Sequence, residues 1–403
     1  MIQNNNIPAG YKDSAVGIIP QEWEVKRIKD LGSVITGSTP PTADVSNYGS
    51  EYMFVSPADL SDNQKYVLST EKMLSSKGYA ISRKMPKGTI LYTCIGSTIG
   101  KIGIASRELT SNQQINAVIC NDKNEYLYYA LLLTTGRIKM LAGEQAVPII
   151  NKSEFENIKL AVPPMEEQRK IAEILGVWDE AIEKQCRLIE RLEERKRGLM
   201  QRLLAGRMRI PGFNTPWQKI KLGEIFKERN ETRCENLPLL SITADKGVIL
   251  QSESDKKDTS NEDKSKYKRI CPNDIGYNTM RMWQGRSALS SLEGIVSPAY
   301  TIVTPKVELD MRFISELIKQ SRVVYDFWTH SQGLVGDTLN CKFHDFSQVR
   351  VLLPSLSEQK AIAEMLATAD NEIVAHRKKL DSLRMQKRGL MQQLLTGKIR
   401  VKK

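Results

Sequence analysis

The stretch EQRKIAEIL at residues 167–175 returns as EQKAIAEML at residues 358–366. Further along, KRGLMQRLLAGRMRI at residues 196–210 returns as KRGLMQQLLTGKIRV at residues 387–401. In both pairs the second copy begins about 191 residues after the first, and the copies align without an insertion or deletion. A long period that occurs only twice indicates a duplicated domain and not a solenoid. We therefore expect a molecule with two similar halves and pseudo-twofold symmetry.

The duplicated stretches have the apolar spacing of two long helices. Apolar residues alternate at intervals of four and three from Ile171 to Leu203, and again from Ile362 to Leu394. This spacing predicts the a/d seam of a coiled coil. Polar residues interrupt both seams at matching positions, namely Gln185 with His376 and Lys196 with Lys387. Such residues either fix the register of the helices or lie where the seam splays apart.

Each predicted helix follows a proline and ends near a glycine, Gly206 or Gly397, as helix start and stop signals require. About forty residues would form a rod of up to ~60 Å. Antiparallel pairing within one chain would place the two globular regions at opposite ends of this spacer.

The remaining regions contain short apolar runs broken by Gly, Pro, Asn and Ser, as in GTILYTCIG at residues 88–96 and GIVSPAYTIVTP at residues 294–305. Such runs predict strands. The sequence therefore predicts an α+β fold, in which two globular domains are separated by a pair of long antiparallel coiled-coil helices with pseudo-twofold symmetry. We place the first domain at residues 1–162, the first spacer helix at 163–206, the second domain at 207–353, and the second helix with its tail at 354–403.

The composition favours a polyanionic partner. The formal net charge is +12, and clustered Lys and Arg gain affinity by releasing phosphate counterions, although many basic proteins bind no nucleic acid. The sequence contains neither an apolar run of ~20 residues nor an N-terminal signal peptide. The six cysteines form no CxxC pair, and there are only three histidines. We expect a soluble, cytoplasmic protein with reduced thiols and no metal centre.

No recognisable catalytic motif is present. GSTIGKIG at residues 96–103 resembles a phosphate-binding loop, but only three residues separate its glycines and Ile102 stands where Ser or Thr should bind Mg²⁺. The chain also lacks the Asn/Asp-Pro-Pro-aromatic motif of amino-methyltransferases and an early glycine-rich cofactor fingerprint. We expect a protein without catalytic machinery of its own.

Polar and basic side chains instead gather in loops between the predicted strands. Amides and guanidinium groups pair with base edges, whereas lysines and hydroxyls suit phosphates. The alternative is that these residues satisfy turn backbones, which is common for Asn and Gln. The candidate DNA-binding residues are Ser38, Thr39, Ser97, Thr98, Lys101, Asn112, Gln113 and Gln114 in the first domain, and Asn278, Thr279, Arg281, Trp283, Gln284 and Arg286 in the second.

Several stretches together resemble the specificity subunit of Type I restriction-modification systems, and the resemblance covers nearly the whole chain. The order of the matching stretches, together with the duplication, makes this resemblance specific. The stretches are GYKDSAVGIIPQEWEVKRIKDLG (10–32), TGSTPPT (36–42), GTILYTCIGSTIGKIGI (88–104), NQQINAVI (112–119), NTMRMWQG (278–285), GIVSPAYTIV (294–303) and the two EQ-to-RGLMQ helices.

The resemblance implies two target-recognition domains, each reading one half of a split sequence in double-stranded DNA, with the helices acting as a ruler. It implies two methyltransferase subunits that methylate adenine N6 with S-adenosylmethionine, and nuclease and translocase subunits that use ATP and Mg. On this reading the chain itself binds no cofactor, no metal and no membrane, and it supplies sequence choice without chemistry.

Three other interpretations stay open at this point. A coiled-coil scaffold presenting two protein-binding modules fits the helices equally well but fits the basic loops less well. A nuclease or methyltransferase with an unrecognised catalytic site would act on DNA without partner subunits. A specificity subunit of a stand-alone methylation or phage-defence system would work without the usual nuclease.

Overall fold

The computed structural model describes residues 7–61, 63–120, 125–143, 147–243, 246–254, 258, 260–333 and 339–401. The chain divides into two compact units. Residues 1–190 and 375–403 form the first unit, and residues 191–374 form the second. Both units combine helices with small sheets, so the predicted α+β class is confirmed.

The first unit contains a five-stranded sheet, a four-stranded sheet and two strand pairs. Its strands are β1 (Tyr11–Lys12), β2 (Ile19–Pro20), β3 (Glu24–Arg27), β4 (Gly32–Thr36), β5 (Tyr48–Val55), β6 (Tyr66–Val67), β7 (Lys72–Leu74), β8 (Lys84–Met85), β9 (Ile90–Thr93), β10 (Ile102–Ala105), β11 (Leu109–Ser111), β12 (Ile115–Cys120) and β13 (Lys159–Val162). Its shorter helices are α1 (Ile28–Leu31), η1 (Val45–Asn47), η2 (Pro57–Asp59), α2 (Ser76–Ile81), α3 (Glu125–Leu141) and α4 (Lys152–Glu156). The sheet orders are β4-β12-β9-β10-β6 and β7-β5-β11-β8, with β1 paired to β2 and β3 to β13.

The second unit contains a four-stranded sheet and three strand pairs. Its strands are β14 (Gln218–Lys221), β15 (Phe226–Glu228), β16 (Leu240–Ile242), β17 (Val248–Leu250), β18 (Lys268–Ile270), β19 (Ile275–Asn278), β20 (Ser287–Leu289), β21 (Gly294–Val296), β22 (Tyr300–Pro305) and β23 (Arg350–Leu353). Its shorter helices are α6 (Leu222–Ile225), η3 (Gln251–Glu253), η4 (Met282–Gln284), α7 (Met311–Leu317), α8 (Ser321–His330) and α9 (Phe343–Gln348). The larger sheet has the order β15-β22-β19-β20, and β14 pairs with β23, β16 with β17, and β18 with β21.

The two units repeat one strand order. The series β4-β12-β9-β10 in the first unit corresponds to β15-β22-β19-β20 in the second, and every neighbouring pair in both series is antiparallel. The pair β3–β13 likewise corresponds to β14–β23, and each pair contains the strand that precedes a long helix. The duplication seen in the helix sequences therefore extends to the topology of the diverged globular regions.

The long helices are α5 (Met165–Leu203) and α10 (Leu356–Leu395), which agree with the helices that the apolar spacing predicts. Most apolar positions of the predicted seam are buried. Gly206 and Gly397 follow the helices with φ of 65° and 71°, a left-handed conformation that glycine adopts without steric cost and that commonly ends a helix.

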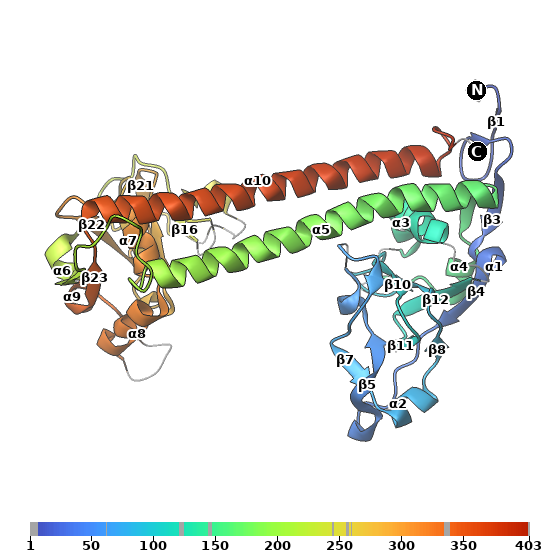
Figure 1. Ribbon diagram of the computed structural model, residues 1–403, viewed down its shortest axis with the longest axis horizontal. Helices are drawn as coiled ribbons and strands as arrows, with labels where there is room; N and C mark the ends of the chain where they lie inside the picture. The colour runs from blue at the N-terminus through green and yellow to red at the C-terminus, as the bar shows by residue number, and fades with distance from the viewer. Residues whose placement is uncertain are drawn as a thin grey trace. The chain divides into compact units, whose positions relative to one another are not determined.

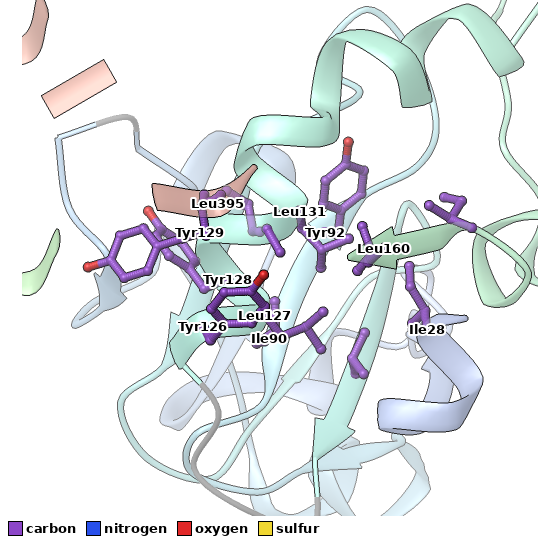
Figure 2. Close-up of a cluster of buried hydrophobic side chains, with 14 of the residues drawn as sticks. Ile28, Ile90, Tyr92, Tyr126, Leu127, Tyr128, Tyr129, Leu131, Leu160 and Leu395 are labelled. Carbon is purple, nitrogen blue, oxygen red and sulfur yellow. The ribbon is translucent and has the colours of Figure 1, made fainter. Parts of the chain in front are cut away.

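Among the described residues, each unit has two apolar cores. In the first unit, Tyr126, Leu127 and Tyr129 of α3 pack against the sheet strand β9, and Leu395 of α10 joins the same cluster (Figure 2). A second, smaller core lies between β5, β9 and β11. Figure 1 shows α3 between α5 and these sheets, with β7, β5 and α2 farther from the long helix. The second unit has the same division, with one core that includes residues of α5 and α10 and another around β16, β18 and β22.

Candidate functional site

The first candidate loops of the first unit meet at the ends of β4 and β11. The backbone N–H of Ser38 donates to the Ser111 carbonyl at 2.9 Å. The hydroxyl of Thr39 donates to the side-chain oxygen of Gln113 at 2.5 Å. Thr39 and Gln113 are both exposed. The structure therefore brings Ser38, Thr39 and Gln113 together, although 74 residues separate the last two in sequence.

Two amides of this group also stabilise their own turn. Asn112 accepts from the backbone N–H of Gln114 at 3.1 Å and donates to the Gln114 side chain at 2.9 Å. The Gln114 carbonyl in turn accepts from the N–H of Cys94 at 2.8 Å. This contact joins the turn to the loop that follows β9.

The loop after β9 carries Ser97, Thr98 and Lys101. Ser97 is exposed and Thr98 is half-buried. The ammonium group of Lys101 donates to the carbonyl of Pro57 at 3.0 Å, so this side chain is held against η2. Among the candidates of the first unit, Thr39, Ser97 and Gln113 are the exposed ones.

In the second unit, three candidates form hydrogen bonds with backbone groups, two within their own loop and one with the segment between β21 and β22. Asn278 accepts from the N–H of Met280 at 2.9 Å. The Thr279 hydroxyl donates to the Ala299 carbonyl, and the Trp283 indole donates to the Met280 carbonyl at 2.9 Å. These bonds fix the shape of the loop between β19 and β20.

The remaining candidates of that loop, Arg281, Gln284 and Arg286, are exposed. Between them Gly285 has φ of 73°, and a Cβ placed there would approach a methyl group of Val324 to 3.2 Å. A left-handed glycine is thus required where the loop turns against α8. The loop is therefore held in one conformation by its backbone contacts, and it exposes the guanidinium groups of Arg281 and Arg286 and the amide of Gln284.

The candidate loops occupy equivalent places in the repeated topology. One group follows β9 and the other follows β19, and these strands are third in the shared strand order.

Burial raises the pKa of the neighbouring thiols, Cys94 and Cys341, to about 12 in each case. Both thiols therefore stay protonated near neutral pH and are poor nucleophiles. In the described ranges, no group of three or more His, Cys, Asp or Glu residues could hold a metal ion. No described helix combines the length and apolar character needed to cross a membrane.

Sequence reasoning missed a cluster around a buried glutamate that occurs once in each unit. In the second unit, the Arg209 guanidinium donates to both carboxylate oxygens of Glu358 at 2.7 and 2.9 Å, and the Trp217 indole donates at 3.2 Å. In the first unit, Arg400 donates to Glu167 at 2.8 and 3.0 Å, and the Trp23 indole donates at 3.0 Å. We call these the Trp-Glu-Arg clusters.

The signal for the Trp-Glu-Arg clusters was present in the repeat. Glu167 with Glu358, and Arg209 with Arg400, are identical letters at the same offset. Their pairing could not be read from this, because each glutamate bonds to the arginine that belongs to the other copy. Each cluster therefore joins the start of one long helix to the segment that follows the other long helix.

The polar seam positions are also paired. Gln185 donates to His376 Nδ1 at 2.8 Å and to the His376 carbonyl at 2.9 Å. Lys196 bonds to Asp370 at 2.6 Å in the second unit, and Lys387 bonds to Asp179 in the first. These contacts favour the interpretation that the polar residues fix the register, because each of them has a partner on the opposite helix.

The comparison with protein families decides what this arrangement belongs to. A family model described as the Type I restriction modification DNA specificity domain matches residues 20–194 and, a second time, residues 214–384. The chain belongs to this family of DNA specificity proteins. The resemblance found in the sequence is thereby confirmed, and so is the presence of two specificity domains.

Curated relatives of this family member include two proteins from Methanocaldococcus jannaschii. The Type I restriction enzyme MjaVIII specificity subunit is 27% identical over 416 residues, which cover 95% of this chain and 94% of the relative. The MjaIX specificity subunit is 35% identical over 191 residues, and this match covers 46% of the chain and 44% of the relative.

Solved structures show the same fold. The S subunit of a Type I restriction-modification system from M. genitalium has a TM-score of 0.54 and 16% identity, with 98% of each chain covered. A chain from a structure that addresses complex assembly and conformational transition of the type I system has a TM-score of 0.60 and 16% identity, covering 94% of this chain and 99% of the other.

Proposed function

We propose that each unit of this specificity protein reads one half of a split sequence in double-stranded DNA. The observation that carries the proposal is the matched placement of the candidate loops after β9 and β19. The exposed candidates differ between the units: Ser97 after β9, with Thr39 and Gln113 in the adjoining turns, in the first, and Arg281, Gln284 and Arg286 after β19 in the second. Two sites of unlike chemistry on one repeated scaffold suit two unlike half-sequences, since amides and guanidinium groups pair with different base edges.

The long helices set the unspecified gap between the half-sequences. Residues 165–190 of α5 belong to the first unit and residues 191–203 to the second, and α10 is divided in the reverse order. The paired seam positions, Gln185 with His376 and Lys196 with Asp370, support an antiparallel coiled-coil spacer with a fixed register. A helix rises ~1.5 Å per residue, and DNA rises ~3.4 Å per base pair, so spacer length determines gap length.

The chemistry is supplied by partner subunits. Two adenine-N6 methyltransferase subunits dock along the helices, one for each repeat, and nuclease and translocase subunits join them for restriction in the cytoplasm. The partners use S-adenosylmethionine, ATP and Mg, whereas this chain contributes recognition without catalysis. Support comes from the family membership. A target adenine must leave the base stack to reach a partner's catalytic site.

The test is methylation mapping with one altered loop at a time. The chain is expressed with its methyltransferase partner in cells free of N6-methyladenine, and the methylated motif is read from the genome. Arg286→Ala should relax only the half read by the second unit, and Gln113→Ala only the other half. A lost bidentate contact costs ~1–3 kcal/mol of discrimination, which is about 5- to 150-fold.

Lys319→Ala, which removes a charge from an exposed position outside both loops, is the matched control and should leave the motif unchanged. A change in both halves from either loop variant, or an unchanged motif in both, would contradict the proposal.

A further inference from the structure

The segment that precedes the last short helix of each unit lies against the candidate loop. In the first unit, Ile150 donates its backbone N–H to the Cys94 carbonyl at 2.9 Å. In the second unit, Cys341 donates to the Thr279 carbonyl at 2.9 Å. Ile150 and Cys341 are separated by the repeat offset, and Cys94 and Thr279 occupy equivalent positions after β9 and β19. The duplicated fold thus places this segment beside the recognition loop in both units.

In the second unit this juxtaposition forms a groove of about 660 Å³. Thr279 from the recognition loop lines this groove. Asn340, Lys342 and His344 from the adjoining segment line it as well, together with Lys268 of β18 and Glu228 of β15. Lys342 and His344 were not among the residues that the sequence indicated.

The side chains of the groove suit a phosphate backbone. Lys342 and His344 are exposed, and within the described residues their side chains have no hydrogen bond or ion pair. Lys268 is 3.5 Å from Glu228, the carboxylate that also lines the groove. Thr301 and Ser347 also line the groove, and the Ser347 hydroxyl donates to the His344 carbonyl at 2.6 Å. Lysines, hydroxyls and amides are the groups that bind DNA phosphates and thereby position a protein on the duplex.

We propose that this groove holds the DNA backbone next to the bases read by the loop at residues 278–286, with Lys342 and His344 as further DNA-contacting residues of the second unit. The inference rests on the proposed function, because it assigns a phosphate contact to the same recognition site. A strand that passes the loop meets the groove at Thr279, which belongs to both.

The first unit lacks the same cations. At the repeat offset, Lys342 corresponds to Asn151 and His344 to Ser153. Asn151 is occupied in capping α4, since its side chain accepts from the Glu154 N–H at 2.9 Å. A phosphate contact by these two cations is therefore expected in the second unit and not at the equivalent positions of the first.

The test uses the complex of this chain with its methyltransferase partner, bound to duplex DNA that contains the mapped motif. Affinity is measured across salt concentrations for Lys342→Ala, Lys342→Arg, His344→Ala and the control Lys319→Ala. The plot of log K against log salt has a negative slope, and the loss of one phosphate contact reduces the magnitude of that slope by about 0.9. Lys342→Ala should show this drop and weaken binding about 5- to 10-fold, equally on the cognate site and on a site altered in its second half. Lys342→Arg should stay within about twofold of the parent.

His344→Ala should weaken binding without relaxing the motif. An unchanged slope and affinity for both Lys342→Ala and His344→Ala would overturn the inference. Loss of the methyltransferase subunit from the complex, with the slope unchanged, would also overturn it by assigning the groove to a protein partner. If the inference alone is wrong, Arg286→Ala still changes the methylated motif, whereas failure of both sets of variants would contradict the proposed function.

Discussion

The Trp-Glu-Arg clusters should be the most sensitive polar positions of the fold. In the second unit, Glu358 is fully buried and its carboxylate receives two bonds from Arg209 and one from Trp217. Arg209→Met would keep most of the side-chain volume and remove the positive charge. Breaking a buried pair in this way typically costs 3–5 kcal/mol, because a charge is left buried without its partner.

The expected cost here is smaller than that range because the Arg209 side chain is 30% exposed. We expect a loss of about 2–4 kcal/mol, which corresponds to a fall of roughly 5–15 °C in the melting temperature of a unit of this size. Scanning calorimetry of the full chain measures this loss. Arg400→Met, the repeat counterpart, should destabilise the first unit in the same way, since its partner Glu167 is also buried.

A second substitution separates the buried charge from packing. Glu358→Gln in the Arg209→Met background should recover at least about 1 kcal/mol, because a neutral amide costs less to bury than an unpaired carboxylate. The reasoning would be refuted if Arg209→Met changed stability by less than about 0.5 kcal/mol, the range of ordinary surface substitutions. It would also be refuted if the added Glu358→Gln gave no recovery.

Three further outcomes follow from the structure. Burial alone would raise the Glu125 pKa, but hydrogen bonds from Lys65 and Tyr66 lower it below 4.5. The contribution of Glu125 to folding stability is therefore complete above pH 4.5, and it is lost as the pH falls through the lowered folded-state pKa. Glu125→Gln should remove that acid dependence in unfolding experiments at a series of pH values, and an unaltered dependence would argue against the pairing. Leu395→Ala, in the core of the first unit (Figure 2), should cost about 2–5 kcal/mol in chemical unfolding, whereas the half-exposed Leu188→Ala should cost under about 0.5; equal costs would contradict the packing. Inserting seven residues beside both Gln185 and His376 should lengthen the methylated gap by at most about three base pairs while both half-sequences stay the same, and altered half-sequences would count against the spacer.

Much of the fold could be predicted from local pattern. The a/d spacing predicted both long helices, whose bounds of Met165–Leu203 and Leu356–Leu395 lie within the expected ranges. The run at residues 88–96 contains β9, and the run at residues 294–305 is divided into β21 and β22. That division follows from Ser297 and Pro298, because proline cannot donate to a sheet ladder.

Contacts between distant residues were less accessible to sequence reasoning. Asn112 was a candidate DNA-binding residue on residue type alone. Only the structure shows that its amide also forms hydrogen bonds within its own turn. The segments around Ile150 and Cys341 approach the candidate loops through backbone bonds, which carry no side-chain signal. The role of the candidate residues in reading bases stays a prediction.

The central claim is that this chain selects a split sequence for methylation, and mapping of N6-methyladenine by single-molecule sequencing tests it most directly. The map is compared between the host and the same host without this gene. The account predicts the loss of one bipartite motif, which would reveal both half-sequences and the gap together. An unchanged methylome in cells shown to express the protein and its methyltransferase would contradict the account.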